Sequence, residues 1–160
     1  MSKKRIKMKL LLKKQNFKKN WKYRTISQKD IRPLGTLMLE SYRDTIDYEG
    51  ETLEDAVREV CATLHGKYGL FMEQCSFLIE ESGQILSACI VVWSEQPKLP
   101  LIAYTMTHPG CQNQGMAAFL LKKSITSLFA QGYKEAYLVV TRGNTAAHHL
   151  YEKIGFQECE

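Results

Sequence analysis

Apolar residues follow one of two spacings along most of this chain, and the two spacings divide it into strands and helices. Short apolar runs predict strands over residues 22–26, 76–80, 85–93, 99–107 and 134–140, with a brief last strand from Phe156. Apolar residues three or four positions apart predict helices over residues 30–42, 52–64, 116–129 and 144–154. The order β-α-α-β-β-β-α-β-α-β indicates a single α/β (α+β, mixed-sheet) domain with helices on both faces of its sheet.

Local signals predict where several of these elements begin and end. Thr52 and Asp55 match the capping-box pattern that opens a helix. Asn144 is a suitable helix N-cap, and Gly155 is a suitable C-cap eleven positions later. A turn around Gly83 predicts a hairpin, and residues 96–100 are expected to form a loop before the next strand.

Charge is distributed unevenly between the N-terminus and the rest of the chain. Residues 1–24 hold eleven of the 22 Lys and Arg residues and none of the 17 acids, so the remaining 136 residues carry 11 basic against 17 acidic groups, a net charge of −6. We expect residues 1–20 to be a disordered basic arm and residues 21–160 to be the folded domain. Such an arm could contact nucleic acid by charge alone, but a solvated tail is the better interpretation and no nucleic-acid partner is expected.

Cysteine usage and hydropathy indicate a compartment. The five cysteines are odd in number, scattered and without a C-x-x-C pair, which argues against a disulfide framework and against a zinc site. No apolar run is long enough to cross a membrane. We therefore expect a cytoplasmic protein with no metal and no membrane partner.

The segment Pro109–Ala117 carries the clearest chemical signal. It joins an apolar strand to an apolar helix through a glycine-containing turn, which leaves backbone N–H groups free at the positive end of the helix dipole. This arrangement suits an anion, phosphate above all. The segment has neither the three glycines of a dinucleotide-binding turn nor the Gly-Lys-Ser/Thr of a P-loop.

Two motifs together resemble the GNAT superfamily of N-acetyltransferases. The first is Gln112-x-x-Gly115-x-Ala117, and the second runs from Asn144 through Ala147 and Leu150-Tyr151 to Gly155-Phe156. The resemblance implies acetyl-CoA as cosubstrate, with its pyrophosphate on the loop amides and its pantetheine arm along strand 99–107. The cofactor-binding residues that it implies are Met106, Thr107, Gln112, Asn113, Gln114, Gly115, Met116, Ala117 and Asn144.

This chain departs from the family in two respects. Its loop has no Arg or Lys, so phosphate attraction rests on amides and the dipole, with Lys122, Lys123 or Arg142 as candidates for the missing charge. Strand 99–107 also lacks the glutamate that serves many relatives as general base. Water, Tyr104, His148 or an acid from the N-terminal half remain open as alternatives.

The resemblance also implies roles in acetyl transfer to an amine. Tyr151 is expected to be catalytic, because a phenol near the sulfur can protonate the leaving thiolate. An acidic stretch with aromatic residues suits a cationic primary amine, belonging to a small molecule or to a protein. The expected acceptor-binding residues are Tyr42, Asp44, Asp47, Tyr48, Glu49 and Tyr104.

Two alternatives stand beside direct acetyl transfer. A noncatalytic acyl-CoA-binding or sensor protein on the same fold would bind without turnover. A nucleic-acid-associated protein would use the basic arm and bind with steep salt dependence. The acceptor remains open, and a homodimer, common among such proteins, is one possibility for the oligomeric state.

Overall fold

The computed structural model describes residues 3–159, which form one mixed sheet and four α-helices. The α/β expectation and the predicted order of elements are confirmed, with one further strand at the N-terminus and a two-residue strand, β3, before the hairpin. The strands are β1 (Arg5–Leu11), β2 (Arg24–Thr25), β3 (Leu70–Phe71), β4 (Phe77–Glu81), β5 (Gln84–Glu95), β6 (Lys98–Thr107), β7 (Glu135–Thr141) and β8 (Gln157–Cys159). The helices are α1 (Ile31–Tyr42), α2 (Leu53–Leu64), α3 (Met116–Ala130) and α4 (Thr145–Ile154).

The sheet follows the order β2-β4-β5-β6-β7-β1-β8, with β3 paired to β5. All neighbouring strands are antiparallel except β6 and β7, which are parallel because α3 carries the chain back between them. The predicted loop at residues 96–100 is shorter than expected, since β5 and β6 continue until only Gln96 and Pro97 separate them. Strand β5 is buried over most of its length, and β6 is buried or partly buried at all but its first residue, which favours continued pairing.

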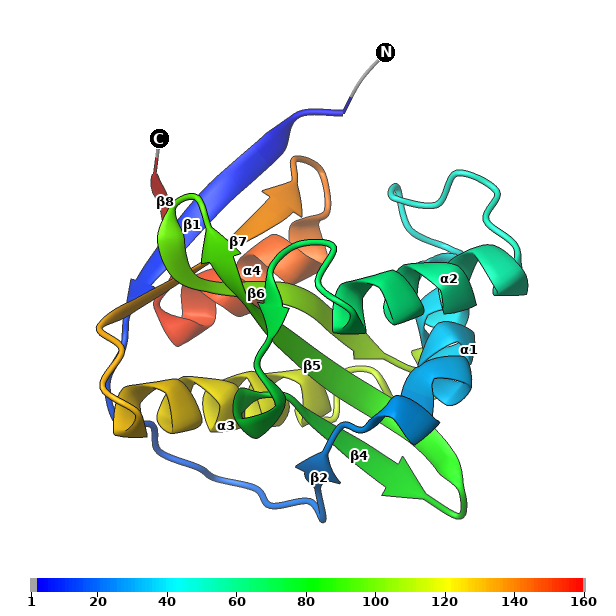
Figure 1. Cartoon of the computed structure of the whole chain (residues 1–160), viewed down its shortest axis with the longest axis horizontal. Helices are drawn as coiled ribbons and strands as arrows, with labels where there is room; N and C mark the ends of the chain where they lie inside the picture. Colours follow the sequence, from blue (N-terminus) through cyan, green and yellow to red (C-terminus); the bar gives the residue numbers. More distant parts are fainter. Residues whose placement is uncertain (1–2, 160) are drawn as a thin grey trace.

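Two apolar clusters cover the two faces of the sheet. Helix α3 packs its buried side chains on one face, where Tyr151 and Ile154 of α4 join it. Helices α1 and α2 cover the other face through residues such as Leu34 and Val60. Figure 1 shows the pair α1 and α2 set apart from α3 and α4. Among residues 3–159, no helix is long and apolar enough to cross a bilayer.

The expectation of a disordered basic arm is wrong for most of its length. Strand β1 pairs with β7 along its whole length. Residues 7–9 of β1 also pair with β8, so β1 lies between β7 and β8 in the sheet (Figure 1). Ile6, Met8 and Leu10 are buried at every second position, while the lysines between them face the other way. Apolar burial therefore outweighs the charge of this segment. Its alternation was the signal for a strand, and the domain begins before residue 21.

The segment between β1 and β2 packs against helix α3. The rings of Phe17, Trp21 and Tyr23 surround Phe119 of α3 with centroids 5.4–5.6 Å away. Lys122 of the same helix donates to the carbonyl of Asn16 at 3.1 Å. Removing residues 1–20 would therefore expose core as well as remove charge, so a truncation cannot isolate a function of the basic residues.

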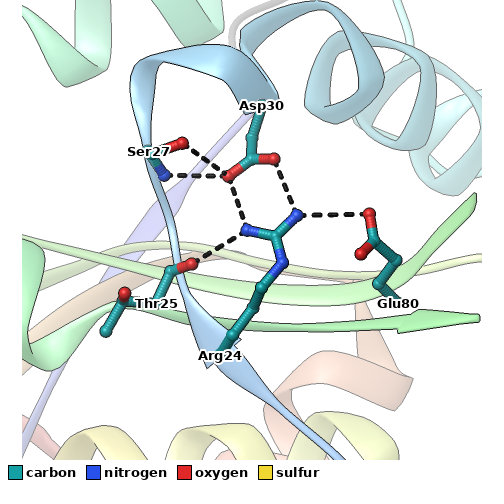
Figure 2. Close-up of polar contacts among 5 residues, drawn as sticks. All are labelled: Arg24, Thr25, Ser27, Asp30 and Glu80. Atoms are coloured by element: carbon teal, nitrogen blue, oxygen red, sulfur yellow. Dashed lines mark hydrogen bonds and ion pairs between the residues drawn. The ribbon is translucent and has the colours of Figure 1, made fainter. Parts of the chain in front are cut away.

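A charged cluster anchors β2 to the start of α1 (Figure 2). The Arg24 guanidinium donates two hydrogen bonds of 2.9 Å to Asp30 and one of 3.2 Å to Glu80. The Ser27 amide also donates to Asp30, at 2.8 Å. Burial of Asp30 raises its pKa, but these donors outweigh that effect and hold the pKa below its ordinary value. We call Arg24, Ser27, Asp30 and Glu80 the clamp.

Candidate functional site

Strands β6 and β7 separate near the middle of β6. In the described part of the chain they pair at a single position, Leu101 with Tyr137. Beyond it, the edge of β6 from Tyr104 to Thr107 has no ladder pairing with β7, while its other edge remains paired with β5. A free strand edge offers N–H and C=O groups in a row, which suits an extended chain of amides. Met106 and Thr107, two of the predicted cofactor-binding residues, lie in this stretch of β6.

Two adjacent residues of β6 direct their side chains to opposite faces of the sheet. A register shift between β5 and β6 occurs just before Tyr104. The Tyr104 ring packs with the cluster below α1 and α2, whereas the Thr105 hydroxyl meets Tyr151 of α4 on the other face. We call Tyr104, Thr105, Tyr151 and the N-terminus of α3 the β6 site.

The loop before α3 leaves the helix N-terminus uncapped by any side chain. Asn113 and Gly115 have φ values of 65° and 87°, so the chain turns sharply through the left-handed region before the helix begins. The first amides of α3, which have no partner within the helix, are thus open to an external acceptor. Gln112, Asn113 and Gln114 are exposed beside them. Backbone N–H groups of this kind at a helix N-terminus can bind an anion.

Trp21 lies directly against this loop. A side-chain carbon added at Gly115 would come within 3.3 Å of the Trp21 ring. The N-terminal segment therefore borders the candidate anion site, which the sequence did not indicate. Lys122 and Lys123 do not supply the missing loop charge in this arrangement, because Lys122 bonds to Asn16 and Lys123 lies 4.3 Å from the centre of the Phe17 ring.

Helix α4 carries the two residues predicted from the C-terminal motif. Asn144 accepts from the Ala147 amide at 3.4 Å and so caps the helix as predicted. Two turns later the Tyr151 hydroxyl lies 3.4 Å from the Thr105 hydroxyl, a long contact that leaves the phenol weakly held. Burial raises the pKa of Tyr151, which keeps the phenol protonated at neutral pH.

The predicted acceptor residues divide into two groups. Asp47 accepts from the Asn144 side chain at 3.2 Å, and the Tyr42 ring meets the Tyr104 ring edge-on at 6.5 Å, so three of the six, Tyr42, Asp47 and Tyr104, lie at or close to the β6 site. The remaining three are not brought into contact with it by the described hydrogen bonds. Asp44 and Glu49 are exposed, and Tyr48 donates to the carbonyl of Glu51.

A carboxylate that the sequence did not single out lies at this site. Glu59 of α2 accepts a short hydrogen bond from the Tyr104 hydroxyl. The sequence offered no signal beyond its place in an acidic helix, because Tyr104 is 45 residues away. In the candidate base His148, Nδ1 lies 3.2 Å from Glu152, while Nε2 lies 3.6 Å from Glu158 and has no hydrogen-bond partner among the described residues. Among the described residues, no group of His, Cys, Asp or Glu is arranged to hold a metal ion.

The surface also has a hollow away from the β6 site. It measures about 250 Å³ and lies beside the clamp, lined by residues that include Lys22, Tyr23 and Glu80. None of the predicted site residues lines it.

Comparison with known proteins gives a family for this fold and site. The model of the acetyltransferase (GNAT) family matches residues 34–156. Curated proteins, in contrast, yield no match.

Solved structures with similar folds include three named acetyltransferases. A GCN5-related N-acetyltransferase from Sphaerobacter thermophilus is 18% identical with a TM-score of 0.73, over 97% of this chain and 48% of that one. This chain thus spans about half the length of that protein. A PaiA N-acetyltransferase from Thermoplasma acidophilum, in complex with coenzyme A, is 17% identical with a TM-score of 0.66, over 85% and 89%. The ribosomal-protein-S18-alanine N-acetyltransferase from Escherichia coli is 19% identical with a TM-score of 0.65, over 87% and 79%.

Proposed function

We propose, from the premise that the chain belongs to the acetyltransferase (GNAT) family and is an acyltransferase, that it transfers an acetyl group from acetyl-CoA directly to a cationic primary amine. The observation that carries the proposal is the combination of an uncapped α3 N-terminus, which begins after Gly115, with an unpaired edge of β6. The cytoplasm is the compartment that we expect for this reaction, and the mechanism needs no metal.

The chain's own residues fit acetyl-CoA at two points. The amides at the start of α3 suit the pyrophosphate, since they are free donors at the positive end of a 15-residue helix. The edge of β6 at Met106 and Thr107 suits the amides of the pantetheine arm. Bound acetyl-CoA supplies an activated acetyl thioester. The protein's largest contribution is to hold it and the amine side by side.

Tyr151 is the residue that we assign to proton transfer. Its phenol stays protonated because burial raises its pKa, and its long contact with Thr105 leaves the proton available to a developing thiolate. No carboxylate lies on β6, so the residue that accepts the amine proton stays open. The Tyr104 hydroxyl donates to Glu59, and burial raises the pKa of its phenol, so Tyr104 is a poor proton acceptor.

The acidic side chains above β6 support a cationic acceptor. Asp47 reaches Asn144, and Glu59 reaches Tyr104, so two carboxylates from the α1–α2 half lie at the site. Negative charge of this kind attracts an ammonium group as it approaches.

Substitution of Ala117 tests the cosubstrate site with little risk to the fold. Gly115 is a poor probe because any side chain there is strained by the positive φ and meets Trp21. In Ala117→Glu, the helix dipole favours the new carboxylate in the first turn of α3, so the fold is retained. The carboxylate competes with pyrophosphate for the same amides, and acetyl-CoA affinity should fall by about tenfold or more.

Calorimetric titration of acetyl-CoA into three proteins makes the comparison. Wild type and the neutral control Ala117→Gln should bind with similar Kd, and Ala117→Glu should bind much more weakly. Equal binding by the Glu and Gln variants would place the pyrophosphate elsewhere. The absence of binding in wild type would remove the acetyltransferase proposal.

A further inference from the structure

One carboxylate near the β6 site is bound by three donors. Glu59 accepts from the Lys67 ammonium at 2.8 Å, from the Tyr68 hydroxyl at 2.6 Å and from the Tyr104 hydroxyl. Its side chain is 24% exposed, so it is mostly withdrawn from water yet reachable from one side. An exposed helix glutamate that served only solubility would not gather two phenols and an ammonium.

Of the three groups that donate to Glu59, the Lys67 ammonium is the one most easily replaced by a ligand. The Lys67 side chain is 48% exposed, and its Nζ lies 5.0 Å from the centre of the Tyr68 ring. A carboxylate and an aromatic face together form a binding site for an alkylammonium group. In this structure a lysine of the chain itself occupies that site.

The site lies across β6 from the proposed thiolate acid. Tyr104 and Thr105 are neighbours in sequence, and their side chains lie on opposite faces of the strand. Tyr104 leads to Glu59 on the α2 side, while Thr105 leads to Tyr151 on the α4 side. Glu59 and Tyr151 are thus connected through two adjacent residues of one strand, from its two opposite faces.

The electrostatic environment of Glu59 favours an amine that stays protonated over the attacking amine, which must lose its proton. Desolvation raises the pKa of Glu59, but the bonds from Lys67, Tyr104 and Tyr68 outweigh it and keep the pKa below its ordinary value. The same carboxylate raises the pKa of Lys67 to about 12. A group that stabilises the ammonium form in this way is a poor base, because the attacking amine must lose its proton.

We infer that Glu59, Tyr68 and Tyr104 bind a second, nonreacting ammonium group of the acceptor, in the place that the Lys67 ammonium occupies here. This rests on the proposed function and narrows its substrate class to acceptors with two or more alkylamines. One amine is anchored at Glu59 while another, on the same flexible chain, reaches the acetyl group. Lys67 competes with the acceptor and leaves when it binds.

The test compares two isosteric substitutions on α2. Glu59→Gln removes the charge and keeps an acceptor for the two phenols, while the control Glu54→Gln removes an exposed carboxylate that pairs with Arg32. Acceptors are 1,4-diaminobutane, with two ammonium groups, and n-butylamine, with one. Glu59→Gln should raise KM for the diamine by about tenfold, the scale of one charge-assisted bond, and leave KM for the monoamine unchanged.

A substitution at Lys67 should change the KM for the diamine in the opposite direction. Lys67→Met removes the competing ammonium and keeps the length of the side chain, so the KM for 1,4-diaminobutane should fall. A merely structural role for the cluster would lower the thermal stability of both variants and leave the ratio of diamine KM to monoamine KM unchanged. That unchanged ratio would overturn the inference.

Calorimetric titration of 1,4-diaminobutane separates this inference from the proposed function. If wild type transfers no acetyl group, the proposed function fails, yet weaker diamine binding by Glu59→Gln than by Glu54→Gln would still support the ammonium site. If wild type is active and the two variants bind the diamine equally, the inference fails alone. A blocked Lys-Lys peptide, titrated in parallel, shows whether a protein acceptor uses the same carboxylate, and Glu59-dependent binding of either ligand supports the inference.

Discussion

The clamp and the β6 site both contain partly buried polar groups, but they hold them differently. In the clamp, Asp30 is only 5% exposed and its oxygens are engaged by Arg24 and Ser27 at 2.8–2.9 Å. At the β6 site, the Tyr151 phenol has one long contact, and the amides of α3 have no side-chain cap. Glu59 is bound in part by a lysine that is half exposed.

This difference separates polar groups that stabilise the fold from those available to a ligand. A buried carboxylate with short bonds inside the protein gains nothing from a further partner. Donors without a partner, or with one that solvent can replace, can exchange it for substrate atoms at little cost. Substitutions in the clamp should therefore cost stability, and those in the β6 site should cost binding or turnover.

The largest expected effect is on turnover at the β6 site. Tyr151→Phe removes the proposed proton donor and should lower kcat by about 100-fold, at the lower end of general acid catalysis. Acetyl-CoA affinity should not change, and the free energy of unfolding should fall by less than about 1 kcal/mol because the bond to Thr105 is long. Single-turnover kinetics measure the rate of acetyl transfer, and urea denaturation measures the free energy of unfolding. An unchanged kcat would remove Tyr151 from the mechanism.

The clamp should show the reverse pattern. Asp30→Asn leaves the Arg24 guanidinium without its main anion and should lower the free energy of unfolding by about 2 kcal/mol. The matched control is Glu80→Gln, whose bond to Arg24 is longer at 3.2 Å and whose side chain is 38% exposed, so its loss should be below about 1 kcal/mol. Urea denaturation measures both. Equal losses would mean that the burial of Asp30 does not matter.

Lowering the pH should reduce the difference in stability between wild type and Asp30→Asn. The pKa of Asp30 is lowered in the folded state, so its contribution to stability is present above its ordinary pKa and disappears as the pH falls through the folded value. Melting temperatures of both proteins between pH 7 and pH 3 should therefore converge toward the acid end. A constant gap would show that the carboxylate acts through shape rather than charge.

The smallest expected effect is the loss of stability in Gly115→Ala. Gly115 belongs both to the fold, through its backbone conformation, and to the candidate site. Gly115→Ala should cost about 1 kcal/mol for its positive φ, with an added cost from contact with Trp21. Gly132→Ala is the control, since its φ is +95° and no heavy atom lies within 4 Å of the added carbon. A larger loss at Gly115, with a change in tryptophan fluorescence, would show that Trp21 presses on the loop. Equal losses and unchanged fluorescence would contradict this.

Local patterns predicted most of the fold. The capping box at Thr52, the hairpin at Gly83 and the cap at Asn144 involve residues only a few positions apart, so their physics is visible in the sequence. Strand β1 was missed because its lysines were weighed as a charged run, although Ile6, Met8 and Leu10 alternate with them. Their burial depends on β7, which comes more than a hundred residues later.

The sequence indicates candidate site residues where they lie within one motif, but not where they depend on distant contacts. The α3 loop and the α4 residues could be found from their spacing. Glu59 could not, because its phenol partners Tyr68 and Tyr104 are 9 and 45 residues away. The position of Trp21 on Gly115 is likewise a product of tertiary packing, with no counterpart in either motif.

The most direct test of the account is acetyl transfer itself. Purified wild-type protein would be mixed with acetyl-CoA and 1,4-diaminobutane, and the release of free thiol compared with the amount of acetylated amine detected by mass spectrometry. The account predicts that thiol and amide form in equal amounts and that both depend on the diamine. Tight binding of acetyl-CoA with no thiol release for any amine tested would contradict it and would favour a noncatalytic acyl-CoA-binding protein.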